Sequence, residues 1–279
     1  MNCWNSHWQK TRFLKGKFYG SIQPFIPTKC WFSKFKFSNK LATSVIIRLR
    51  MEDLTKVYKT PLPDSPYVRP FRLNYTQGGK EKNWDMLEVH DSVAIIVFNV
   101  TRNVLIFVKQ FRPAIYYNSV PIQDRQNSTI DTDKYPASLG ITLEMCAGIV
   151  DKNKSLQEIA KEEVLEECGY DVPLYELQKI ASYRAGVGVQ GSLQTMFYCE
   201  VTDDMKKGKG GGVDDEIIEV VEKTISEVES WISGPGPLNS PPSCLFALMW
   251  FLRNKADKYR KNRCNHETPV DLFLYLPFY

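Results

Sequence analysis

The sequence predicts an α/β protein in which helices cover the faces of a mixed β-sheet. Short β-branched segments alternate irregularly with helical ones along the 279 residues, and this order favours a mixed sheet. The hydrophobic content of 43% and the aromatic content of 13% are typical of a folded protein with a substantial core. No apolar run approaches the roughly 18 residues of a membrane-spanning helix, so no membrane partner is expected.

The first fifty residues differ in charge from the rest of the chain. They contain ten Lys or Arg and no acidic residue, whereas residues 51–279 contain 26 basic and 32 acidic residues. The net charge of +4 therefore belongs to this segment, and the body gives no reason to expect a nucleic-acid partner. We expect residues 1–50 to be a basic N-terminal extension. It is either a disordered addition before a start at Met51, in a cytoplasmic protein, or a mitochondrial presequence.

The cysteine pattern argues against both a zinc site and a disulfide framework. The seven cysteines are scattered and odd in number, no CxxC pair occurs, and the chain has only three histidines. We therefore expect reduced, mostly buried thiols of a cytosolic type.

Eight strands are expected from β-branched and alternating segments, and turn residues separate them. Gln77-Gly78-Gly79 is a turn signal between the first two, which form a small antiparallel sheet within residues 51–92. The strands are predicted at 71–76, 83–89, 93–99, 104–110, 141–146, 180–183, 193–201 and 217–222.

Helices and loops complete the main domain, which we place at residues 93–262, before a C-terminal tail at 263–279. Residues 118–138 are polar and contain two prolines, so they are expected to form a loop. The Lys- and Gly-rich residues 205–212 are expected to be a mobile linker. Helices are predicted at 156–168, 226–232 and 243–262, the last capped by Ser243.

The helix at 156–168 has clear end signals in the sequence. Ser155 is followed three residues later by Glu158, which is the pattern of a capping box. Gly169 supplies the left-handed residue that ends many helices.

The acidic residues of this helix lie where its apolar residues lie. At about 100° per residue, Glu163 and Glu167 fall in the middle of the apolar stripe and Glu166 falls at its edge. Burying an unpaired carboxylate is costly, and carboxylates three or four residues apart also repel one another. A divalent cation that prefers oxygen ligands, such as Mg²⁺, removes both penalties and also binds substrate phosphates. The pattern therefore predicts a metal platform.

Residues 148–170 resemble the Nudix box, Gly-x5-Glu-x7-Arg-Glu-U-x-Glu-Glu-x-Gly-U, where U is a bulky apolar residue. The matching residues are Gly148, Glu163, Val164, Glu166, Glu167, Gly169 and Tyr170. Two positions depart from the pattern, because Lys154 stands in place of the first Glu and Glu162 in place of the Arg. The pair is reversed in sign, and we hypothesise that Lys154 and Glu162 still form an ion pair.

Other motifs within residues 67–253, and just before them, resemble the UDP-sugar pyrophosphatase branch of the Nudix superfamily, near the ADP-ribose pyrophosphatases. This resemblance implies the Nudix fold and a homodimer formed through the strands of 51–92. The motifs are the residues 65–70, 84–85, 90–93, 108–113, 144–148, 186–188 and 194–198.

The resemblance also implies a set of metal ligands. Glu163 and Glu167 would be the principal ligands, together with the Ala147 carbonyl and with help from Glu166. The metal would be Mg²⁺, with Mn²⁺ as the alternative.

Substrate and catalytic roles follow from the same resemblance. Glu216 would be the general base, with nearby Asp214 as the alternative, and Glu166 the second catalytic carboxylate. Arg112 would hold a phosphate, because its planar guanidinium suits oxyanions. Trp84 would stack on the nucleobase at a site shared with a second subunit. The remaining substrate-binding residues would be Arg69 and Gly188.

The implied activity is metal-dependent hydrolysis of the diphosphate bond of a nucleoside-diphosphate sugar. UDP-glucose, which would give UMP and glucose 1-phosphate, is the first candidate and ADP-ribose the second. Two alternatives stay open: a Nudix hydrolase of another nucleoside diphosphate derivative (a dinucleotide, coenzyme A or a cap), and a catalytically weakened nucleotide-binding module. The reversed Lys154/Glu162 pair favours the weakened module, whereas the three intact carboxylates oppose it.

Two further signals are interpreted as structural. Residues 186–191 satisfy G-x-G-x-x-G, but strands flank them, so they are expected to form a hairpin loop. His90 is expected to make a structural hydrogen bond at a strand entrance.

Overall fold

A computed structural model describes residues 39–126, 128–213 and 215–260. Its strands are β1 (Val57–Tyr58), β2 (Arg69–Gln77), β3 (Lys80–Glu88), β4 (Ser92–Asn99), β5 (Val104–Phe111), β6 (Thr129–Ile130), β7 (Ile141–Glu144), β8 (Cys146–Ile149), β9 (Gln178–Arg184), β10 (Leu193–Val201) and β11 (Ile218–Thr224). Its α-helices are α1 (Asn39–Glu52), α2 (Pro113–Ser119), α3 (Ile122–Arg125), α4 (Leu156–Glu163), α5 (Ile225–Ile232), α6 (Pro242–Asn254) and α7 (Ala256–Arg260).

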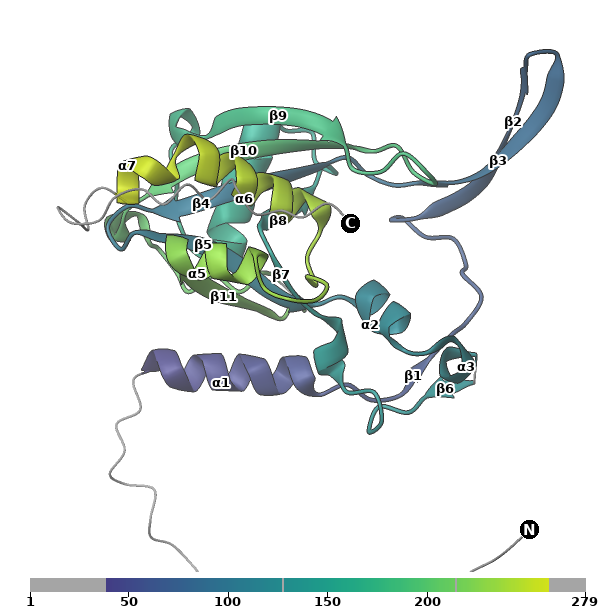
Figure 1. Ribbon diagram of the computed structural model, residues 1–279, viewed down its shortest axis with the longest axis horizontal. Helices are drawn as coiled ribbons and strands as arrows, with labels where there is room; N and C mark the ends of the chain where they lie inside the picture. Colours follow the sequence, from purple (N-terminus) through teal and green to yellow (C-terminus); the bar gives the residue numbers. More distant parts are fainter. Residues whose placement is uncertain (1–38, 127, 214, 261–279) are drawn as a thin grey trace, which may run out of the picture. The chain divides into compact units, whose positions relative to one another are not determined.

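The centre of the domain is a mixed sheet in the order β11-β5-β4-β10-β9 (Figure 1). Strand β10 runs parallel to β4, and the other pairs in the sheet are antiparallel. Strand β7 pairs with β5, and strand β8 pairs with β4. This arrangement confirms the predicted mixed sheet.

Helices cover both faces of the sheet, and the alternation of side chains along β4 shows why. Val93, Ile95 and Val97 lie in one core cluster with the apolar residues of α4. Ala94, Ile96 and Phe98 lie in a second cluster with α5, α6 and α7. Because successive strand residues point to opposite faces, one strand that is apolar from Val93 to Phe98 contributes to both cores. Full burial of each large aliphatic side chain contributes about 1.5–3 kcal/mol.

The expected strands are present, but the segment 141–146 is divided. Residue Met145 separates β7 from β8 because the chain passes from one partner strand to the next. Glu144 pairs with Val108 of β5, whereas Cys146 pairs with Ile95 of β4. The prediction of one continuous strand is therefore wrong at this point.

The prediction of a loop at 118–138 is also wrong in part. The end of α2, the helix α3 and the strand β6 lie within it, and β6 pairs with β1. Tyr116, Val120 and Ile130 form a small third core there. These apolar residues are too far apart in the sequence to produce a recognisable period.

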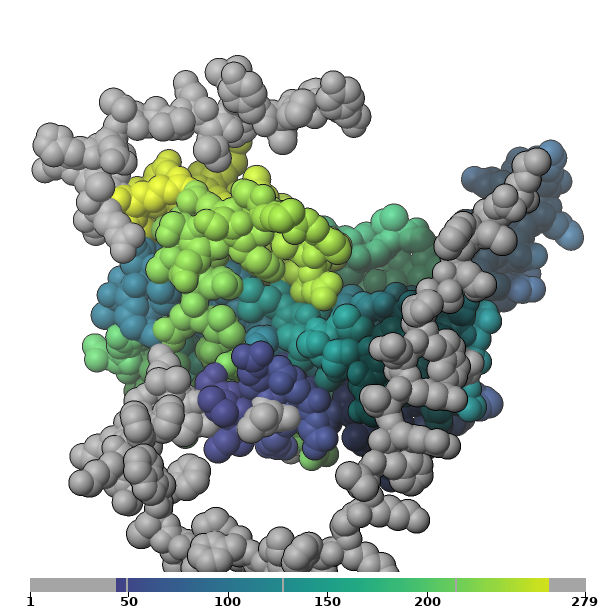
Figure 2. Space-filling view, turned by 60° about the horizontal axis from the view of Figure 1, so that its bottom comes forward, coloured from purple at the N-terminus to yellow at the C-terminus, as the bar shows by residue number. Residues whose placement is uncertain are grey.

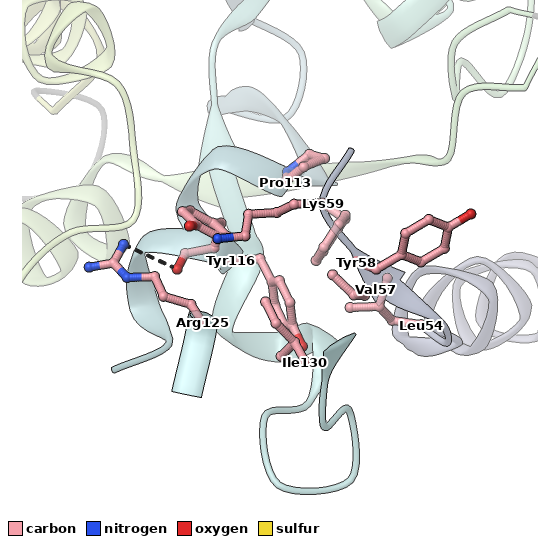
Figure 3. Close-up of a pocket in the computed structure, with 10 residues that line it drawn as sticks. Leu54, Val57, Tyr58, Lys59, Pro113, Tyr116, Arg125 and Ile130 are labelled. Carbon is pink, nitrogen blue, oxygen red and sulfur yellow. Dashed lines mark hydrogen bonds between the residues drawn. The ribbon is translucent and has the colours of Figure 1, made fainter. Parts of the chain in front are cut away.

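A cavity of about 330 Å³ lies between residues 54–59 and residues of the segment 111–130 (Figure 3). Its lining is mostly apolar, and two cations flank one aromatic ring. The Lys59 amino group lies 5.7 Å from the centroid of the Tyr117 ring, and the Arg125 guanidinium lies 5.2 Å from it.

Helix α1 crosses the boundary that was expected at residue 50. Its Ser44 hydroxyl donates a hydrogen bond to Glu219 of β11, and Met51 is buried. The purple helix lies on the surface that faces the viewer in Figure 2. The expectation of disorder therefore does not hold for residues 39–50, because this segment packs against the edge of the sheet. Residues 1–38, on which the alternative of a mitochondrial presequence depends, lie outside the described residues.

The C-terminal helix begins and ends differently from the prediction. Its N-cap is Pro241 rather than Ser243, and the helix is interrupted at Lys255, where α6 ends before α7 begins. Proline is well suited to a helix start, because the first N–H groups have no partner within the helix. The tail at 263–279 lies outside the described residues.

The expected burial of the cysteines is confirmed for the described part of the chain. Its cysteines, Cys146, Cys168, Cys199 and Cys244, are all buried and free. Among the same residues, no helix is long and apolar enough to cross a membrane.

Candidate active site

Helix α4 starts with the predicted capping box. The Ser155 side chain accepts from the Glu158 N–H, and the Glu158 carboxylate accepts from the Ser155 N–H. Gly169 ends the helical segment with a φ of 79°, also as predicted. The last turn, however, is a π-helix at Val164–Cys168, so the regular helix expected over 156–168 is wrong in its second half.

The π-helical turn is bonded to the Gly-rich loop. The N–H groups of Gly211 and Gly212 donate to the carbonyls of Glu167 and Glu166 at 2.9 and 3.1 Å. An added Cβ on Gly210, whose φ is +69°, would lie 2.2 Å from the Glu167 carbonyl oxygen. The expected mobile linker at 205–212 is therefore a close-packed loop. A π-helical turn leaves carbonyls for partners outside the helix, and such turns are frequent at functional sites.

Strand β8 holds the two central carboxylates of the helix. The Ala147 N–H donates to Glu167 Oε2 at 3.0 Å. Gly148 lies under Glu163, because a Cβ at Gly148 would come within 2.0 Å of Glu163 Oε1. The glycine thus provides the space in which the Glu163 carboxylate rests.

Burial opposes the ionisation of both carboxylates. Glu167 is 5% exposed, and burial raises its pKa to about 8, although the Ala147 hydrogen bond acts in the opposite direction. Burial, together with a smaller effect of the charge of Glu166, raises the pKa of Glu163 to about 7. The charge of Glu216 contributes to the raised pKa of both Glu163 and Glu167.

The donor set fits a hard divalent cation. Within the described residues, no group of three or more His, Cys, Asp or Glu side chains stands together as a ready-made metal cage. The fit rests instead on two carboxylates that are held on β8 and whose charge is disfavoured by burial and mutual repulsion. A divalent cation relieves both effects.

Glu216 lies after the Gly-rich loop, and its own backbone surroundings fix its position. Its Oε2 accepts from the Val213 N–H at 2.9 Å. Asp214, the alternative base, lies outside the described residues.

Arg112 is engaged by a partner that the sequence did not single out. It forms a two-pronged ion pair with Glu144, at 2.8 Å for both Nε–Oε1 and Nη2–Oε2. Glu144 belongs to the motif at 144–148, but its contact with Arg112 joins two strands and leaves no signal in the local sequence.

The structure brings together two of the predicted substrate-binding residues. Trp84 Nε1 donates to the Gly188 carbonyl at 2.7 Å, and Trp84 is 52% exposed. Gly188 lies between β9 and β10, which confirms a hairpin loop at 186–191. Arg69 begins β2, opposite Glu88 rather than beside Trp84.

No family model matches the chain. The chain is 41% identical over 198 residues to "Uridine diphosphate glucose pyrophosphatase NUDT14" of Mus musculus, covering 67% of this chain and 89% of the relative. The chain belongs to the Nudix hydrolases. Enzymes of this superfamily generally use a divalent metal.

Other matches are shorter or structural. A GDP-mannose pyrophosphatase of Salmonella typhimurium (strain LT2) is 33% identical over 142 residues, or 50% of this chain and 64% of the relative. A solved structure, "Crystal structure of ADP compounds hydrolase", has a TM-score of 0.49 and 13% identity, and covers 72% of this chain and 95% of that one.

The departures from the Nudix box retain an ion pair. Lys154 and Glu162 are in contact, as hypothesised, and Lys152 also approaches Glu162, at 3.3 Å. His90 makes the expected structural hydrogen bond, between Nε2 and the Pro66 carbonyl at 3.2 Å.

The first prediction concerns the glycine under Glu163. Gly148→Ala should lower kcat/KM by about 10²-fold or more, because the new methyl group displaces a carboxylate that must be held within about 1 Å. Gly191→Ala is the matched control, since its Cβ would meet no atom within 4 Å. Steady-state kinetics and thermal unfolding of both variants test this. Wild-type kinetics in Gly148→Ala would contradict the placement of Glu163.

The second prediction concerns stability and pH. The folded pKa values of Glu163 and Glu167, about 7 and 8, lie above the ordinary value of 4.5. The folded state therefore binds these protons more tightly than the unfolded state, and stability falls as pH rises from about 4.5 to about 8. We expect the Tm of the metal-free protein in EDTA to fall over this range and Mg²⁺ to restore it at the upper end. Glu167→Gln should flatten the profile; an unchanged slope in that variant would contradict the assignment.

Proposed function

We propose that this chain is a Mg²⁺-dependent pyrophosphohydrolase of nucleoside-diphosphate sugars, with UDP-glucose first and ADP-ribose second. The observation that carries the proposal is the pair of half-buried Glu163 and buried Glu167, held on β8 by Gly148 and Ala147. The relatives named as UDP-glucose pyrophosphatases, of which the chain covers 89%, support the substrate class.

Glu163 and Glu167 would hold the cation, together with the Ala147 carbonyl and with support from Glu166. When bound, Mg²⁺ supplies charge neutralisation of the diphosphate and of the leaving phosphate. Burial disfavours the ionised forms of both carboxylates, and a bound divalent cation would stabilise those forms.

The remaining chemistry is assigned to side chains. Glu216 accepts a proton from a water molecule while the water oxygen forms a bond to one phosphorus of the diphosphate. Glu166 assists by orienting the water. The bond from that phosphorus to the bridging oxygen breaks, and Arg112 donates hydrogen bonds to the phosphate oxygens. UDP-glucose and water thus yield UMP and glucose 1-phosphate.

Trp84 and its neighbours are proposed to bind the nucleoside. The Trp84 indole is anchored by the Gly188 carbonyl, yet half of its surface remains exposed for stacking on a base. Arg69, on the same hairpin, would contact the substrate through its guanidinium.

The β2–β3 hairpin supports a homodimer. In Figure 1 it extends away from the central sheet, and its cross-strand register places an apolar stripe on one face. The stripe consists of Phe71, Leu73, Tyr75 and Trp84, which are between 37% and 52% exposed. A two-stranded hairpin is marginally stable alone in water, and an apolar stripe of this kind marks an interface. A second copy of the chain is the proposed partner, and Trp84 lies within the stripe.

A cytoplasmic location is proposed from the reduced, buried cysteines. A mitochondrial location would depend on residues outside the described part of the chain.

The third prediction is turnover by the full-length protein. With Mg²⁺, UDP-glucose should be converted to UMP and glucose 1-phosphate, and EDTA should abolish the reaction. Glu167→Gln should lower kcat by about 10²-fold or more, because it removes a charge that holds the cation. The assay uses a panel of UDP-glucose, ADP-ribose, GDP-mannose and NADH, with products separated by chromatography.

The panel also separates the alternatives. If the protein hydrolyses another compound of the panel instead of UDP-glucose, the proposed mechanism stands but the proposed substrate is wrong. Tight, metal-independent nucleotide binding without turnover of any member would refute the enzyme and favour a binding module.

The fourth prediction concerns assembly. Leu73→Glu should weaken dimerisation by about tenfold or more, because it places a charge within the apolar stripe. Asn74→Glu is the matched control on the opposite, polar face of the same strand. Sedimentation velocity across a concentration series measures both variants. A wild-type protein that stays monomeric throughout would disprove the dimer.

A further inference from the structure

Glu144 is a buried carboxylate with a defined partner on each oxygen. It is 4% exposed, although it lies at the end of β7 beside the active site. Arg112 donates to both of its oxygens, and the Thr142 hydroxyl donates to Oε1 at 2.6 Å. Thr142 is itself buried.

The ion pair uses only one edge of the Arg112 guanidinium. Nε and Nη2 face Glu144, and within the described residues no further hydrogen bond from this guanidinium is present. A guanidinium carries five N–H donors, so the Nη1 end and the second Nη2 hydrogen remain available. The Arg112 side chain is 46% exposed, whereas that of Glu144 is 5% exposed. One edge is therefore held inside, and the other is presented outward.

Arg112 lies near the helix carboxylates, because its partner Glu144 stands three residues before Ala147, whose N–H holds Glu167. The Glu144 hydrogen bonds raise the pKa of the Arg112 guanidinium, and the charges of Glu167 and Glu216 raise it further. An arginine released from Glu144 would be drawn toward those two carboxylates. It would then neutralise groups that a divalent cation needs, and its donors would leave the phosphate position.

We propose that Glu144 is a positioning residue that holds Arg112 for the substrate phosphate and keeps it from pairing with the metal-binding carboxylates. Thr142 fixes the Glu144 carboxylate in turn. This inference rests on the proposed function, because it requires that Arg112 binds a phosphate and that Glu167 binds a cation.

The test is Glu144→Gln in the full-length protein, with UDP-glucose as substrate and Mg²⁺ varied. We expect kcat/KM to fall about 10- to 100-fold, as for other groups that orient a ligand. The Mg²⁺ concentration for half-maximal activity should also rise, because the freed Arg112 competes with the cation. A merely structural role would lower the Tm without moving that concentration. Thr142→Val keeps the charge of Glu144. It should lower kcat/KM and raise the half-maximal Mg²⁺ concentration, but by less than Glu144→Gln.

Two comparisons make the outcome decisive. Glu219→Gln is the matched control, because Glu219 is a half-buried strand carboxylate that pairs with Lys109 on the neighbouring strand. It should leave the kinetics unchanged. Glu144 acts through Arg112, so Arg112→Ala/Glu144→Gln should be no slower than Arg112→Ala. Losses that multiply in the double variant, or a wild-type Mg²⁺ requirement in Glu144→Gln, would overturn the proposal.

A binding measurement separates this inference from the proposed function. Calorimetric titration with UMP and Mg²⁺ requires no turnover, and Glu144→Gln should weaken UMP binding by about tenfold. An inactive wild-type protein that binds UMP more tightly than the variant would refute the hydrolase and retain the role of Glu144. Equal binding by the two would refute that role.

Discussion

The structure is organised around two carboxylates that lie on the inner side of a helix, where burial opposes their charge. Glu163 rests against Gly148, and Glu167 accepts from the Ala147 N–H. Water cannot solvate these groups well, so each must be held by the protein or neutralised by a ligand. The surrounding structure holds the helix that carries both carboxylates at its two ends. The capping box fixes one end of the helix, and the Gly-rich loop bonds to the carbonyls of its last turn.

The short segment 144–148 connects the two halves of the proposed site. Before the break at Met145, Glu144 pairs with β5 and holds Arg112. After it, Ala147 and Gly148 pair with β4 and hold the helix carboxylates. The change of partner strand therefore places Arg112, proposed to bind the phosphate, near the carboxylates that are proposed to bind the metal. A continuous strand, as expected from the sequence, would follow only one partner and could not do this.

Local signals in the sequence predicted the helix and its carboxylates well. The cap at Ser155, the end at Gly169 and the inward direction of Glu167 depend on residues within a few positions of one another. The π-helical turn was not predictable in this way, because the loop that bonds to it lies some forty residues later in the chain. The contact between Glu144 and Arg112 also joins residues that are distant in the sequence, so it was not predicted. The packing of α1 was not predicted for the same reason, because its partner Glu219 lies on β11. Contacts between distant residues determined each of these features.

The reversed pair at Lys154 and Glu162 shows how the site tolerates a change of sign. An ion pair at this position braces the loop before the helix, and either polarity can provide that contact. The reversal changes the electrostatic potential at Glu163, because the neighbouring position 162 carries a glutamate instead of the usual arginine. Lys152 compensates: it approaches Glu162, and its charge lowers the pKa of Glu163 against the larger effect of burial. The positive charge has thus moved from the helix to the loop, and the helix carboxylate remains under its influence. This substitution explains how an altered motif can coexist with an intact set of proposed metal ligands, and it argues for a working hydrolase rather than a weakened binding module.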